Sequence, residues 1–143
     1  MKTAILFLIL VFTANILLMA TNIDYIFRSF NVDPILHFFG GFFVTMFFAD
    51  YLKHLNPGNP GSPKLKKLLI LVSVTVFIGV VWEFSEYLAT NLFGNYLYNK
   101  YRIICCMGNL DDTIRDLLMD TLGAITLILA IEVKSYKRLI KKY

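Results

Sequence analysis

The chain has 143 residues, of which 57% are hydrophobic, and its formal net charge is +4. Soluble domains are usually about 45–50% apolar, so this composition argues against a soluble protein and indicates a multi-pass protein of the cell membrane. The basic residues flank apolar segments and accompany no nucleic-acid-binding fold, which argues against a nucleic-acid partner.

Four apolar runs account for the excess of hydrophobic residues: 3–20, 35–52, 68–88 and 113–131. Each run is close to the ~20 residues that a helix needs to cross a bilayer. Because lipid offers the backbone no hydrogen bonds, each run is predicted to be helical. We therefore expect an all-α fold, in which residues 1–143 form a single transmembrane domain of four helices.

The first run, 3–20, follows Lys2 and has two interpretations. It is either an uncleaved transmembrane helix or a secretory signal. No clear cleavage pattern ends it, Asn15 interrupts it, and it is longer than the roughly 7–15 apolar residues of a signal core. We expect an uncleaved helix; a cleaved signal would leave three spans.

The second run begins after Asp33-Pro34, a pair typical of a helix N-cap followed by proline at the first helical position. His37 lies about 5 Å further along the helix axis. Gly40 and Gly41 lie beside it and would allow a second backbone to approach closely. His37 is either a packing histidine or part of a site.

The third run ends with Glu83 and Glu86, which share one helix face with Gly79. The proline-rich stretch 56–63 before this run is predicted to be an irregular turn. The segment that follows it, 89–111, is rich in tyrosine, which suits the lipid headgroup level. We expect it to be external, and the sequence does not decide between a lid and a short interfacial element.

The fourth run is preceded by Asp111 and Asp112, which we interpret mainly as capping and dipole-complementing residues. Asp112 also falls with Asp116, Asp120 and Gly123 within an arc of about 80° on a helix. Asp112 is therefore either a cap or a member of a polar face that continues into the span.

The charges predict an orientation. Of the 14 lysines and arginines, all but Arg28, Lys100, Arg102 and Arg115 fall on the side that holds both termini and the loop between the second and third spans. This bias follows the positive-inside rule and predicts that both termini are cytoplasmic. The acidic ends of the last three spans then lie at the extracytoplasmic face.

An ionised residue at the centre of a span costs about 2.5–3.5 kcal/mol on insertion, and clustered acids also repel each other. Either some of the acids hold protons or a cation lies among them. A histidine with several carboxylates suits a divalent ion such as Zn, Mn or Mg. The predicted metal ligands are His37, Glu83, Glu86, Asp116 and Asp120. The alternative is a hydrogen-bonded network that only fixes helix register.

Three motifs carry a family resemblance: Asp33-Pro-x-x-His37-Phe-x-Gly40-Gly41, Trp82-Glu83-x-x-Glu86, and Asp112-Thr113-x-x-Asp116-Leu-x-x-Asp120-Thr-Leu-Gly123-Ala. Together they resemble the YjdF-type small membrane proteins and are more distantly similar to the VanZ-like family. The latter resemblance implies a role in the cell envelope and in antibiotic susceptibility. Glu86 and Asp120 stand where VanZ-like proteins carry glutamine and asparagine, which favours a cation here. The resemblance supplies no reaction.

Three functions are compatible with these residues. The first is a metal-dependent hydrolase or transferase acting on a lipid or lipid-linked envelope substrate, with Glu83, Asp112 and Asp116 as catalytic residues and Glu83 or Asp112 as the base. The second is a non-enzymatic module that binds or transports a cation, lipid or drug, for which a homo-oligomer is expected. The third is a structural membrane protein. The sequence does not decide whether the chain is an enzyme.

Overall fold

The computed structural model describes residues 1–20, 32–55, 64–103 and 109–140. In this part of the chain it contains four α-helices and no strand: α1 (Lys2–Ala20), α3 (Val32–Leu55), α4 (Lys64–Tyr101) and α5 (Leu110–Ile140). The predicted all-α class is therefore confirmed for the described residues. Each helix contains one of the predicted apolar runs and extends beyond it.

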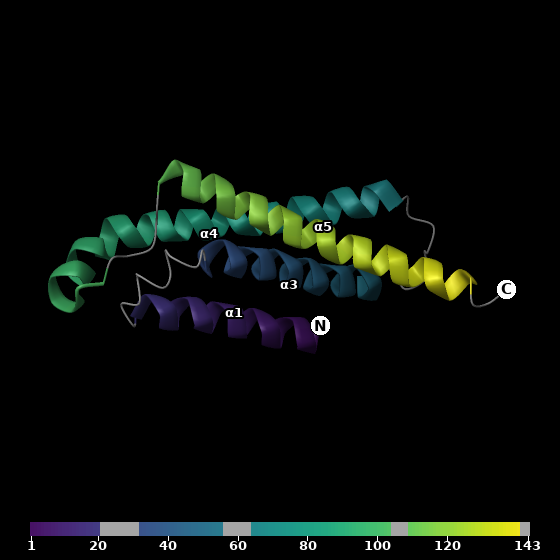
Figure 1. The fold of residues 1–143 in the computed structure, drawn as a ribbon, viewed down its shortest axis with the longest axis horizontal. Helices are drawn as coiled ribbons and strands as arrows, with labels where there is room; N and C mark the ends of the chain where they lie inside the picture. The colour runs from purple at the N-terminus through teal and green to yellow at the C-terminus, as the bar shows by residue number, and fades with distance from the viewer. Residues whose placement is uncertain (21–31, 56–63, 104–108, 141–143) are drawn as a thin grey trace.

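The helices lie side by side and alternate in direction, so that α1 begins and α5 ends at the same end of the bundle (Figure 1). α3 is the central helix, because it packs against α1, α4 and α5. Its contact with α5 is the most extensive in the described part of the molecule. Residues from α3, α4 and α5 therefore meet along α3.

Membrane-spanning character differs among the helices. By length and composition, α3 over Val32–Lys53 and α4 over Leu65–Tyr101 are able to cross a bilayer, and α1 contains a shorter apolar stretch, Lys2–Leu17. α5 carries acidic residues among its apolar ones, which lowers its mean hydropathy. Crossing by all four helices stays a prediction.

Burial is inverted relative to a soluble protein. Large apolar side chains such as Leu6 and Phe77 are 62% and 65% exposed, whereas Asp116 is only 2% exposed and Thr45 is fully buried. Soluble proteins bury the opposite set of residue types. The pattern is that of helices with an apolar surround and a polar interior.

The segment 89–101, which the sequence left open as a lid or an interfacial element, continues α4 as a helix. α4 curves at this end (Figure 1). It ends before Arg102, whose φ of 58° is the left-handed conformation that often terminates a helix. The predicted turn 56–63 and the cysteines Cys105 and Cys106 lie outside the described residues.

Two glycines determine how closely α3 and α5 pack. A Cβ on Gly41 would overlap the backbone of Asp120, and a Cβ on Gly123 would overlap the backbone of Phe38. The two helix backbones therefore touch where these glycines lie, as small residues allow in membrane helices. The predicted close approach is confirmed at Gly41, whereas Gly40 has room for a side chain.

Beyond this crossing, the interface becomes apolar. Thr45 and Thr75 share a buried hydrogen bond of 2.7 Å between their hydroxyl oxygens. Further along, Ala49, Leu71 and Ile128 form a buried apolar cluster that joins α3, α4 and α5. The interior thus changes from polar to apolar along the bundle.

Candidate functional site

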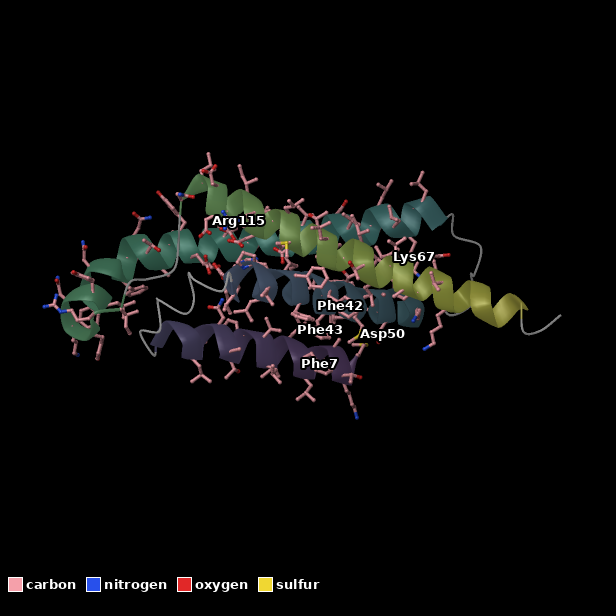
Figure 2. All side chains as sticks on the ribbon, in the orientation of Figure 1. Phe7, Phe42, Phe43, Asp50, Lys67 and Arg115 are labelled. Atoms are coloured by element: carbon pink, nitrogen blue, oxygen red, sulfur yellow. The ribbon has the colours of Figure 1, made fainter. Side chains whose placement is uncertain are left out.

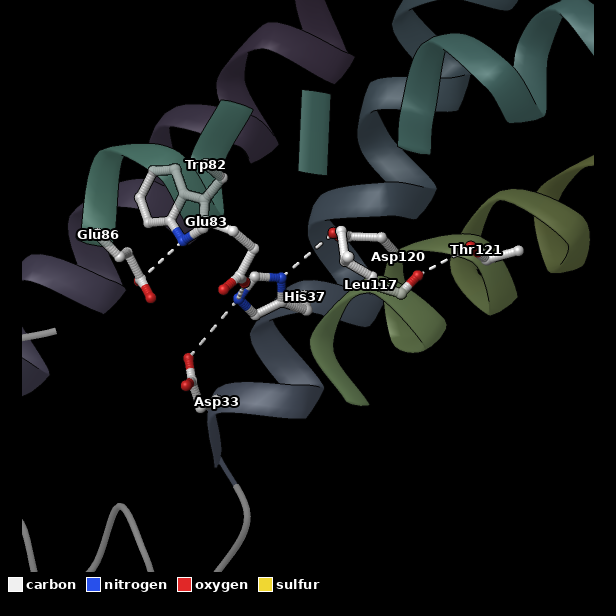
Figure 3. Close-up of polar contacts among 8 residues, drawn as sticks. All are labelled: Asp33, His37, Trp82, Glu83, Glu86, Leu117, Asp120 and Thr121. Carbon is white, nitrogen blue, oxygen red and sulfur yellow. Dashed lines mark hydrogen bonds and ion pairs between the residues drawn. The ribbon is translucent and has the colours of Figure 1, made fainter. Parts of the chain in front are cut away.

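His37 lies at the centre of a buried polar cluster between α3, α4 and α5 (Figure 3). Its Nδ1 is 3.3 Å from Asp120 Oδ2 of α5. Its Nε2 is 3.9 Å from Asp33 Oδ1 and 3.8 Å from Glu83 Oε1 of α4. The two ring nitrogens therefore face different groups.

His37 Nδ1 and Asp120 Oδ2 lie within hydrogen-bonding distance, and the tautomer of the ring decides which atom donates. When Asp120 is ionised and His37 is neutral, Nδ1–H donates to the carboxylate and Nε2 carries the lone pair. Histidines that bind metals characteristically donate their other N–H to a carboxylate in this way. Asp120 thus orients the ring and leaves Nε2 able to act as a ligand.

The Nε2 side contains carboxylate oxygens that lack partners. Asp33 Oδ1, Glu83 Oε1 and Asp116 Oδ1 are buried and accept no hydrogen bond. Two of these oxygens lie 3.8–3.9 Å from Nε2, which is too far for a hydrogen bond. A buried polar atom without a partner costs about 1–3 kcal/mol, and more when it is charged. The three helices therefore bury three costly acceptors, one each from α3, α4 and α5, and two of them lie beside Nε2.

Asp120 is held in place by two glycines. Its backbone lies against Gly41 of α3, and its side chain occupies the space that a Cβ on Gly79 of α4 would need. Only an absent side chain on each neighbouring helix permits this position. The glycines that the sequence associated with a polar face therefore make the His37–Asp120 contact possible.

Glu86, the other predicted ligand of α4, is buried and accepts a hydrogen bond of 2.9 Å from Trp82 Nε1 (Figure 3). Trp82 lies one helical turn before it, so this contact is made within α4. The bond satisfies Glu86 Oε1, in contrast to Glu83 Oε1.

Asp33 lies in the site, although the sequence analysis assigned it to helix capping. It was expected to be an N-cap, but α3 begins at Val32 and Asp33 lies in its first turn. One turn separates Asp33 from His37, so the two side chains lie on the same helix face. The four-residue spacing between Asp33 and His37 was the feature of the sequence that could have assigned Asp33 to the site.

The two acids at the start of α5, Asp111 and Asp112, make none of the contacts with His37 described above. Asn109, not Asp111, caps the helix, because its Oδ1 accepts the backbone N–H of Asp112 at 3.0 Å. Asp111 is exposed and Asp112 is half-buried in the first turn, where both complement the helix dipole. Arg115 is also exposed and forms no ion pair with any described residue (Figure 2).

The arrangement has the donor set of a metal site. One ligand atom each from Asp33, His37 and Asp116 lie within 4.8 Å of one another, and Glu83 Oε1 adds a fourth donor at 3.8 Å from Nε2. Ligands about 2.0–2.2 Å from a divalent ion lie roughly 3–3.5 Å apart. Small side-chain movements would bring these atoms into coordination range.

A cavity of about 430 Å³ adjoins the cluster and is lined by residues of α1, α3 and α4, together with Asp120. Its walls are almost entirely apolar, with Leu8 and Val11 on α1 and Val44 on α3. His37 and Asp120 also line it. The His37 ring therefore lies between an apolar cavity and a group of unpartnered carboxylates.

A family model described as "Predicted membrane protein (DUF2238)" matches residues 1–136. A protein of Thermotoga maritima, named only as an uncharacterized protein, is 33% identical over 100 residues, which cover 70% of this chain and 47% of that protein. The chain thus spans about half the length of this curated relative. No solved structure matches.

Proposed function

Because the chain belongs to the family of predicted membrane proteins DUF2238, of which the YjdF-type proteins are members, we propose that it is a multi-pass protein of the cell membrane. The four described helices cross the bilayer with the His37 cluster near the extracytoplasmic face. Lys67 lies toward the opposite end from Arg115 (Figure 2), and the basic residues near that end support a cytoplasmic assignment for it. The likeness to VanZ-like proteins stays a prediction.

The function that the geometry supports best is a divalent metal centre within the membrane. The observation that carries it is the set of three buried carboxylate oxygens without hydrogen-bond partners, of which those of Asp33 and Glu83 lie beside His37 Nε2. Asp116, which carries the third, offers a ligand atom within 4.8 Å of ligand atoms of Asp33 and His37. Asp33, His37, Glu83 and Asp116 are the proposed ligands, and Asp120 is the residue that orients His37. A donor set of one imidazole and three carboxylates suits Zn, Mn or Mg.

A metal in this position supports hydrolysis or group transfer on a lipid or lipid-linked molecule, because a divalent ion polarises a phosphoryl or acyl oxygen. Glu86 and Asp112 lie on the helices that carry the ligands and are available for proton transfer. Glu86 is the better candidate, since it is buried and its carboxylate is oriented by Trp82. Asp112, half-buried at the helix start, is the second candidate.

The test is metal content, measured by elemental mass spectrometry on the purified protein in detergent. We expect one bound divalent ion per chain and its loss in Asp116→Asn. The matched control is Asp111→Asn, since Asp111 is an exposed acid on the same helix. Metal that is absent from the wild type, or retained in Asp116→Asn, would overturn the metal centre.

Two further assays separate the remaining functions. Lipid turnover by the metal-loaded protein, lost in Asp116→Asn while the variant stays folded, supports an enzyme. Cation flux into proteoliposomes that is lost in Glu83→Gln would support a transport module instead. A protein with neither metal nor flux would have a structural role, in which the cluster only fixes helix packing.

A further inference from the structure

The apolar cavity beside the cluster shares His37 and Asp120 with the proposed metal centre, and its remaining walls have no part in that centre. It lies between α1, α3 and α4, and its lining includes exposed side chains of two helices, Phe12 on α1 and Ile78 on α4. Among the described residues α1 packs closely against α3 but not against α4 or α5. The cavity therefore opens sideways between α1 and α4, where the rings of Phe12 and Trp82 meet edge to face at 5.7 Å.

The cavity also has a direction. On α3 its lining begins at Leu36 and His37 and ends at Val44, and on α4 it runs from Trp82 back to Thr75. Seven residues of helix correspond to about 10 Å along the axis. Asp33 and Glu86 lie beyond the other side of His37, toward the end of the bundle. The cavity thus runs from the polar cluster toward the middle of the spans, with His37 at one end and Val44 and Thr75 at the other.

On this basis, and resting on the proposed metal centre, we propose that the substrate is a membrane lipid. One of its hydrocarbon chains occupies this cavity and its headgroup lies at His37 and the carboxylates. A cavity with apolar walls that opens toward lipid fills with hydrocarbon, because water finds no partners there. Its volume of about 430 Å³ lies within the range of ligand pockets.

The orientation follows from the bilayer. A lipid of the outer leaflet has its headgroup at the membrane surface and its chain directed toward the midplane. The polar cluster and the cavity follow one another in the same order along α3. The lipid therefore enters between α1 and α4 without inverting, and its ester or phosphoryl group reaches the metal site.

The test uses phosphatidylglycerol with a photoreactive diazirine in one acyl chain, in proteoliposomes of phosphatidylglycerol and phosphatidylethanolamine. Labelled residues are located by mass spectrometry. A diazirine near the ester should label the region of Trp82, and one near the terminal methyl should label Val44 and Thr75. The reverse order would overturn the proposed orientation.

Leu8→Trp fills the cavity from α1, away from the metal ligands, and should reduce labelling at Val44 and Thr75 several-fold. Leu6→Trp is the matched control, since Leu6 is 62% exposed on the same helix and does not line the cavity. Labelling that Leu8→Trp leaves unchanged, or that is no stronger than at the exposed Phe77, would overturn the proposed lipid site.

Metal content of the same samples separates the two proposals. Bound metal without labelling of the cavity would contradict the lipid assignment, and the proposed metal centre would still be supported. Cavity labelling without metal would contradict the metal centre while the hydrocarbon site remains supported. Metal retained in Leu8→Trp together with lost labelling supports both.

Discussion

The two halves of the contact between α3, α4 and α5 are packed by opposite chemistry. In one half, Ala49, Leu71 and Ile128 form an apolar cluster whose members need no further partner. In the other half, His37 is surrounded by acids that include three oxygens without a hydrogen bond. Apolar helix packing gains little from the hydrophobic effect in lipid, so the apolar half contributes mainly van der Waals contact.

Under the proposed metal centre, the apolar half serves stability, whereas the polar half lowers stability in exchange for a binding capacity. Replacing buried ionic groups by apolar ones is often neutral or stabilising. A polar half that retains unpartnered acids is therefore best explained by a ligand that completes it. The predictions below test this division, beginning with the largest expected effect.

Gly123→Ala should disrupt both halves at once. A Cβ there would overlap backbone atoms of Phe38 and Phe42, so α3 and α5 must separate. Overpacking typically costs about 1–3 kcal/mol, and more where backbone must move. We expect a marked loss of folded protein in size-exclusion chromatography and thermal unfolding. Gly94→Ala is the control, because among the described residues a Cβ at Gly94 meets Thr90 Cγ2 alone, at 3.9 Å. An equal loss in Gly94→Ala would contradict the close-packing argument.

Leu71→Ala should damage only the apolar half. Leu71 is 1% exposed, and truncating such a side chain costs about 2–5 kcal/mol. We expect a lower free energy of unfolding with unchanged metal content. Leu69→Ala, at a side chain that is 55% exposed, should have little effect. Loss of metal in Leu71→Ala would show that the two halves are not separable.

Asp116→Leu should have the opposite effect on stability. The substitution removes a buried carboxylate oxygen that has no hydrogen-bond partner, and burying such a group costs about 1–3 kcal/mol. The comparison is made in the presence of a chelator, so that both proteins are free of metal. We expect the metal-free variant to unfold at a higher temperature than the metal-free wild type. Asp111→Leu, at an exposed position, should change stability by less than about 0.5 kcal/mol. A destabilised Asp116→Leu would indicate that the acids hold the helices together.

Thr75→Val should have the smallest effect, because it lies between the two halves. It removes the 2.7 Å hydrogen bond with Thr45, and such interhelical bonds in membranes average about 0.6 kcal/mol. We expect a small decrease in unfolding temperature and normal metal binding. Ser73→Val, at an exposed position on the same helix, is the control. A loss of several kcal/mol would mean that this pair is coupled to the site.

Much of the fold follows from the order of residues. The four apolar runs correspond to the four described helices, and the approximate 3.6-residue period brings Asp116, Asp120 and Gly123 onto one face. The sequence grouped His37 with Glu83, Asp116 and Asp120, and the structure brings these residues of three helices into one cluster. The ends of the helices were predicted less accurately. α4 continues to Tyr101, and Asn109 caps α5 in place of Asp111.

The sequence by itself determined which residues are helical and which helix face carries each polar group, because these depend on rise and rotation within one helix. Only the tertiary structure decided that Asp33 faces His37 Nε2, that Asp120 lies on the Nδ1 side, and that Glu86 is bonded to Trp82. These contacts depend on the rotation and crossing of α3, α4 and α5 relative to one another and on the side-chain conformations that this packing permits. The crossing of α3 and α5 is determined by close backbone contact at Gly41 and Gly123, a property of the assembled helices that no single helix contains.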